Sequence, residues 1–141
     1  AAAAKRAAPV LIVLTVDGWH EFSTVHPDDE LVLNAFAQDQ RRDKGFGPAL
    51  GGNAAEYLAA AARRFGFVVD SESSDWHIPA DATAMLNALV DGIAAAASAA
   101  RPALAWRVKA WHETRKGAIA ARRLEIAIGH RDVCAYPDRR A

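Results

Sequence analysis

Runs of apolar residues along the chain predict three β-strands. Residues 10–16 form a continuous aliphatic and β-branched run without alternation, which is typical of a strand buried on both faces of a parallel sheet. Residues 67–71 form a shorter run, and residues 124–136 alternate between apolar and polar positions on either side of Gly129 and His130. We therefore predict a small sheet whose last strand has a bulge or bend at Gly129.

Four other segments have apolar residues at helical spacing, and we predict them as helices: residues 27–40, residues 53–65, a segment that begins at Asp81 and ends before Arg101, and a segment that begins at Pro102. Asn53 and Glu56 have the spacing of a capping box, and Asp81 is placed to cap the third helix. Gly66 is the expected stop of the second helix.

The order of these elements predicts an α/β fold. A chain of 141 residues has the size of one domain, so we assign residues 1–141 to a single domain. The apolar strand at 10–16 requires neighbours on both sides, and three strands supply few. This mismatch indicates that sequence is missing before the chain.

Composition narrows the class of protein. Lys and Arg total 17, as do Asp and Glu, so the net charge is zero, which makes nucleic acid an unlikely partner. The single Cys134 excludes an internal disulfide and suits a reducing cytoplasm. We find no apolar run of about 20 residues, so we expect no membrane span and a cytoplasmic location.

The most unusual stretch is the glycine-rich loop, residues 40–53, with the sequence QRRDKGFGPALGGN. Its glycines permit positive φ, and a loop of this kind is typical of a lid that contacts substrate. We predict that substrate is bound by Gln40, Arg41, Asp43, Lys44 and Phe46. Two alternatives remain: a solvated surface loop, and a phosphate cradle, for which the preceding strand and a Gly-Lys-Ser/Thr motif are lacking.

The other candidate catalytic or ligand-binding residues stand singly in the sequence and form no known motif. The five histidines show no metal-ligand spacing, so no metal site is predicted. Asp17 ends the first apolar run, where ligands of open α/β sheets bind, although Asp17-Gly18 is also an ordinary turn pair. Trp76 lies in a polar linker and is a candidate ligand contact. No catalytic base is assigned, and Asp43 and His20 are candidates only.

Two stretches carry a resemblance to a known family. They are residues 14–67, which contain QRRDKGFGPALG, and residues 73–97, in which Ser74 and Trp76 match an S-x-W element. Together they resemble the C-terminal half of a bacterial class I S-adenosylmethionine-dependent methyltransferase. In that family the glycine-rich segment lies between the fifth strand and the next helix.

The resemblance implies a Rossmann-like sheet in which residues 10–16, 67–71 and 124–136 are the fifth, sixth and seventh strands. The seventh strand would be antiparallel and inserted between the other two. The family binds S-adenosylmethionine with segments that precede the fifth strand. The chain would therefore be the acceptor-side portion of the enzyme, with S-adenosylmethionine bound only in the intact parent protein, no cofactor bound by this chain alone, and the methyl acceptor unidentified.

The competing hypothesis is a non-enzymatic dimerising or interaction module derived from the same fold. A half-sheet that exposes the edge of residues 10–16 needs a covering chain, so a homodimer through this edge is expected. A nucleic-acid role through Arg41, Arg42 and Lys44 is a third hypothesis, which the zero net charge disfavours.

Overall fold

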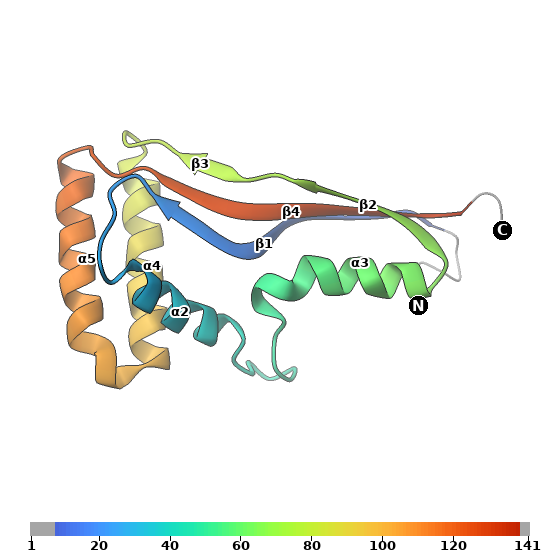
Figure 1. Cartoon of the computed structure of the whole chain (residues 1–141), viewed down its shortest axis with the longest axis horizontal. Coiled ribbons are helices and arrows are strands. Elements are labelled where there is room, and N and C mark those ends of the chain that lie inside the picture. The colour runs from blue at the N-terminus through green and yellow to red at the C-terminus, as the bar shows by residue number, and fades with distance from the viewer. Residues whose placement is uncertain (1–7, 139–141) are drawn as a thin grey trace. The chain divides into compact units, whose positions relative to one another are not determined.

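The computed structural model describes residues 8–138, in which four strands and four helices form an α/β structure (Figure 1). The elements are β1 (Val10–Phe22), α2 (Asp29–Gln40), α3 (Ala54–Arg64), β2 (Phe67–Ser73), β3 (Trp76–Ile78), α4 (Thr83–Ala100), α5 (Ala105–Ala120) and β4 (Ile126–Pro137). Short 3₁₀ turns at Gly51–Asn53 and Pro102–Leu104 precede α3 and α5. The predicted α/β class is confirmed.

The last strand lies inside the sheet. The strand order is β1-β4-β2, and β3 also pairs with β4. Strand β4 runs antiparallel to both β2, where Asp70 is opposite Cys134, and β3, where His77 is opposite Ala127. The expected insertion of the last strand between the other two is therefore confirmed.

The chain divides into two compact units, and β1 and β4 contribute to both. The first unit contains β1 up to Trp19, the segment Leu50–Asp75, and β4 from Gly129 onward. The second unit contains His20–Ala49 and Trp76–Ile128.

The core of the first unit is small. Ala55 and Ala59 of α3 pack against Val133, and Ile12 and Val69 are partly buried beside them. Because side chains alternate along a strand, Leu11 and Val13 point away from Ile12, and they are 68% and 50% exposed. The prediction that residues 10–16 are buried on both faces is therefore wrong for this chain, since α3 packs against only one face.

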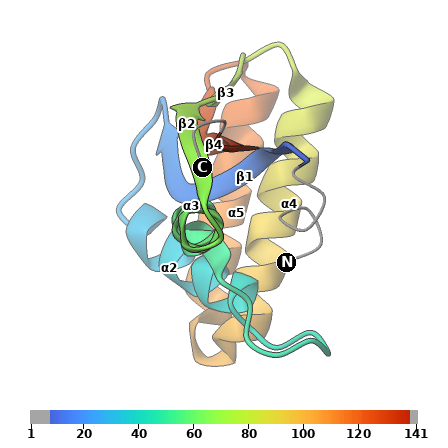
Figure 2. The same cartoon turned by 90° about the vertical axis from the view of Figure 1, so that its right-hand side faces the viewer.

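The core of the second unit is larger and joins three helices to the ends of the strands. Helix α4 contacts both α2 and α5, as Figure 2 shows from the side. The buried residues Leu86, Val90 and Ile93 of α4, and Val108, Trp111 and Ile119 of α5, form one cluster. The predicted break before Pro102 is confirmed.

Two predicted helix caps are wrong. Asn53 stands at the N-cap of α3 without a side-chain cap bond, because it belongs to a 3₁₀ turn in which its N–H donates to Leu50 O at 3.2 Å. Ala82, rather than Asp81, stands at the N-cap of α4. The predicted stop at Gly66 is correct, since Gly66 has a φ of +79° directly after α3.

Two of the three predicted strands are longer than expected. Strand β1 continues through Asp17-Gly18 to Phe22, because Gly18 takes a φ of +91° and Asp17 Oδ1 accepts the Trp19 N–H at 2.9 Å within the strand. The expected turn there is absent. Strand β2 extends to Ser73, and β3 lies in the predicted linker, where pairing with β4 orders three residues. Strand β4 runs continuously through Gly129.

Among the described helices, α4 is the one that has the length and apolar composition to cross a membrane. Core helices of water-soluble proteins also have these properties, so the observation is weak evidence. Leu86, Val90, Ile93 and Ala97 of α4 are fully buried in the core of the second unit. These contacts account for the apolar face of the helix.

Candidate functional site

The glycine-rich loop has an ordered internal structure. Asp43 Oδ1 accepts the N–H groups of Gly45 at 2.7 Å and Gly47 at 3.0 Å. Both glycines have positive φ, +105° and +89°, which other residues adopt only at a cost. Ala49 N–H donates to Arg41 O at 3.2 Å and closes the loop on the end of α2. The Asp43 carboxylate therefore organises the loop.

The cations of the loop are partly neutralised. Asp39 of α2 accepts Arg42 Nε at 3.1 Å and lies 3.5 Å from Lys44 Nζ. The hydrogen bond from Arg42 is the main cause of the lowered pKa of Asp39. Phe46, in contrast, is fully exposed at the tip of the loop. The loop therefore exposes an aromatic ring to solvent, on a backbone that is held by the hydrogen bonds to Asp43.

The structure keeps five of the six predicted substrate-binding residues together and separates the sixth. Gln40 ends α2, and Arg41, Asp43, Lys44 and Phe46 follow it in the loop. Trp76 begins β3. Figures 1 and 2 both show β3 on the opposite side of the second unit from the loop. Trp76 and the loop therefore do not form one site in this chain.

A second candidate is a polar groove of about 510 Å³ in the first unit. It lies between α3 and the strands, and we call it the Asp17 groove. Its lining residues come from β1, the end of the glycine-rich loop, α3, β2 and β4: Asp17, Trp19, Gly52, Asn53, Ala55, Glu56, Ala59, Arg63, Ser71 and Arg131.

Small residues make the groove hollow. Gly52, Ala55 and Ala59 face it from the loop and α3, so no long side chain from these positions fills it. Gly52 also allows the backbones to approach, because an added Cβ would lie 2.6 Å from Asp17 O. An added Cβ at Gly129 would lie 2.1 Å from Asp17 Oδ1. Gly52 is therefore required by close contact with the main chain of Asp17, whereas a side chain at position 129 would displace the Asp17 carboxylate.

The Asp17 groove contains charges of both signs. Asp17 and Glu56 are acidic, Arg63 and Arg131 are basic, and the last three are exposed. Ser71 Oγ is buried and has no hydrogen-bond partner among the described residues. Sequence analysis identified Asp17 as a candidate but missed the other groups, because they come from separate elements. A pattern that could have indicated the groove is the pair of small residues Ala55 and Ala59, four positions apart in α3.

A further hollow of about 370 Å³ lies in the second unit. Glu21, Ser23, His77 and Glu125 contribute polar groups to its lining. Among the described residues, no group of three or more His, Cys, Asp or Glu side chains is arranged to hold a metal ion.

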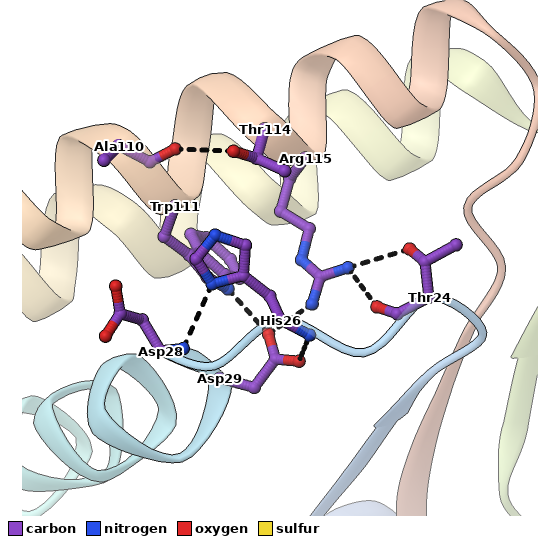
Figure 3. Close-up of polar contacts among 8 residues, drawn as sticks. All are labelled: Thr24, His26, Asp28, Asp29, Ala110, Trp111, Thr114 and Arg115. Atoms are coloured by element: carbon purple, nitrogen blue, oxygen red, sulfur yellow. Dashed lines mark hydrogen bonds and ion pairs between the residues drawn. The ribbon is translucent and has the colours of Figure 1, made fainter.

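A buried polar cluster, also missed from the sequence, joins α5 to the start of α2 (Figure 3). Arg115 is 1% exposed; its guanidinium donates to Thr24 and pairs with Asp29, and it stacks over Phe22 at 4.5 Å from the ring centroid. Asp29 also accepts Trp111 Nε1 at 2.7 Å and the His26 N–H at 2.8 Å. Hydrogen bonds and an ion pair within the cluster satisfy most of its polar atoms. We therefore interpret the cluster as a structural contact between α5 and the start of α2.

A surface contact between α4 and α5 involves His112. His112 Nε2 lies 2.6 Å from Asp91 Oδ1 of α4, and Lys116 Nζ lies 3.0 Å from the same oxygen. The hydrogen bond with His112, followed by that from Lys116, lowers the pKa of Asp91. These contacts connect the two helices at their surface.

In comparisons with known proteins, no protein-family model and no curated sequence matches this chain. Arguments about function therefore depend on the fold, the glycine-rich loop and the Asp17 groove.

Proposed function

We propose that this chain is the acceptor-side, C-terminal portion of a class I S-adenosylmethionine-dependent methyltransferase. The observation that carries the proposal is the position of β4, which lies between β1 and β2 and runs antiparallel to β2. The sequence resemblance implies this order for the fifth, seventh and sixth strands of the family. The methyl acceptor is unidentified.

The environment of β1 supports the same proposal. Strand β1 stands at one end of the described strand order, and Leu11 and Val13 are exposed. An aliphatic strand with an open edge is suited to a larger sheet, in which further strands and helices cover it. In the intact parent those elements would bind S-adenosylmethionine, and this chain alone would not.

The glycine-rich loop is proposed to cover the acceptor. Methyl transfer depends mainly on holding a nucleophile in line with the sulfonium methyl group, so shape and exclusion of water matter more than a strong base. The exposed ring of Phe46 supplies apolar contact, and Lys44 supplies a charge. Asp43 holds the loop backbone in position.

Variants of the loop in the intact parent test this role. Phe46→Ala is expected to lower kcat/KM for the acceptor about 10-fold or more, since burying a phenyl ring contributes about 1.5–3 kcal/mol. Lys44→Ala is expected to lower it as well, while the affinity for S-adenosylhomocysteine stays unchanged in both. Phe65→Ala is the matched control, because Phe65 is exposed outside the loop. Full acceptor turnover in both loop variants would contradict the proposed role.

A non-enzymatic dimerising module is the second candidate. The open edge of β1 and the exposed Leu11 and Val13 favour it, since such a strand pairs readily with another chain. Light scattering on the purified chain separates the candidates: a dimer that Val13→Lys dissociates would support the module, whereas a monomer would exclude it.

A further inference from the structure

We propose that the Asp17 groove binds a small zwitterion, with its ammonium group beside Asp17 and its carboxylate beside Arg131. The groove lies wholly within the first unit of this chain. The inference is therefore independent of methyl transfer, and its failure would leave the proposed function untouched.

The strand positions place the Asp17 carboxylate and Arg131 on the same face of the sheet. The Asp17 carboxylate lies against Gly129 of β4, and Arg131 follows two residues later on the same face of the strand. The two backbone positions are thus about 7 Å apart, given a rise of about 3.4 Å per residue. Ser71 is opposite Val133, so it is a diagonal neighbour of Arg131 on this face.

The basic end of the groove has unused hydrogen-bonding capacity. Arg131 is exposed and forms no ion pair among the described residues. Ser71 Oγ is buried without a partner, which costs about 1–3 kcal/mol. Because this buried atom cannot be reached from the groove, a ligand carboxylate would accept hydrogen bonds from Arg131, and Arg63 provides a further positive charge at the groove.

The end of the groove that contains Asp17 is suited to binding a cation. Asp17 Oδ1 accepts the Trp19 N–H, and a carboxylate has capacity for further donors. Trp19 is 44% exposed and lines the groove, so its indole is available to an ammonium group. Glu56 adds a second carboxylate to the lining.

Because the groove contains charges of both signs, it is expected to favour a zwitterion over a simple anion or a simple cation. An anion alone would meet Asp17 and Glu56 as well as the arginines, and a cation alone would meet Arg63 and Arg131. A zwitterion pairs each of its charges with the opposite sign and avoids the repulsion that excludes the other two classes.

Isothermal titration of the purified chain with three related probes tests the proposal. The probes are 6-aminohexanoate, which carries both charges on a flexible alkyl chain, hexanoate, and hexylamine. We expect 6-aminohexanoate to bind about 10-fold more tightly than either single-charge probe, since a hydrogen bond to a charged group contributes about 1.5–3 kcal/mol. Amide shifts in NMR spectra should concentrate at Gly52, Ser71 and Arg131.

Three variants test which residue binds the carboxylate of the ligand and which binds its ammonium group. Arg131→Gln should weaken binding of 6-aminohexanoate about 10-fold, and Asp17→Asn, which keeps an acceptor for Trp19, should do the same. Arg64→Gln is the matched control, because Arg64 is exposed on α3 outside the lining, and should bind normally. Absence of binding, equal affinity for the three probes, or unchanged affinity in Arg131→Gln would overturn the proposal.

Discussion

Two glycines of the first unit lie in close contact with the same residue, Asp17. Gly52 approaches the main-chain carbonyl of Asp17, whereas Gly129 approaches its side-chain carboxylate. The sequence shows that these positions are glycine but not what they touch, because both partners are distant along the chain. The expected bend at Gly129 was wrong for this reason: the glycine makes room for a carboxylate.

Alanine substitutions at these glycines test the two contacts. Gly52→Ala and Gly129→Ala should each lower the free energy of unfolding by about 1–3 kcal/mol, because the new methyl group overlaps Asp17. In an Asp17→Ala background Gly129→Ala should become nearly neutral, since the clashing carboxylate is gone. Gly52→Ala should remain destabilising there, since it meets a main-chain oxygen. Urea unfolding followed by circular dichroism measures each value.

Gly92 in α4 provides the control for this series. An added Cβ at Gly92 meets no atom within 4 Å. Gly92→Ala should therefore stabilise the chain by about 0.5–1 kcal/mol through helix propensity. If Gly129→Ala were as harmless as Gly92→Ala, the close contact with Asp17 would be disproved.

Among the elements, α5 shows that a helix face with an apolar sequence pattern can also contain a buried ion pair. The buried face of α5 contains the apolar residues Val108, Trp111 and Ile119, and the charged Arg115 lies on the same face. Its burial becomes intelligible only with Asp29 and Thr24, which precede it by 86 and 91 residues. Predictions based on spacing succeed for apolar faces and miss buried ion pairs of this kind.

Arg115→Met tests whether the buried polar cluster around Arg115 stabilises the folded chain. The variant should lower the free energy of unfolding by about 3 kcal/mol, the lower end of the range for a broken buried pair, because Asp29 keeps its donors from Trp111 and His26. Lys109→Met removes the exposed pair with Glu113 and should cost less than about 0.5 kcal/mol. Equal midpoints of urea unfolding in the two variants would contradict the structural role of Arg115.

The short strands show another limit of local patterns. Strand β3 has three residues, and its polar surroundings indicated a linker. Its order comes from pairing with β4, in which His77 is opposite Ala127, 50 residues farther along the chain. Pairing of this kind has no local signature in a single sequence.

For the whole molecule, the α/β class and the order of the main strands could be predicted, the latter through the family resemblance. The burial of β1 could not, because an apolar run predicts a covered strand whether or not this chain supplies the cover. The glycine-rich loop was evident from composition. The Asp17 groove was not, because it is assembled from residues of separate elements.

The central claim is that this chain carries the acceptor side of a methyltransferase and not the S-adenosylmethionine site. Isothermal titration with S-adenosylhomocysteine tests it most directly, on the 141-residue protein and on the protein extended through its upstream coding sequence. We expect no measurable binding to the 141-residue protein and micromolar binding to the extended one. Tight binding by the 141-residue protein, or none by the extended protein, would contradict the claim.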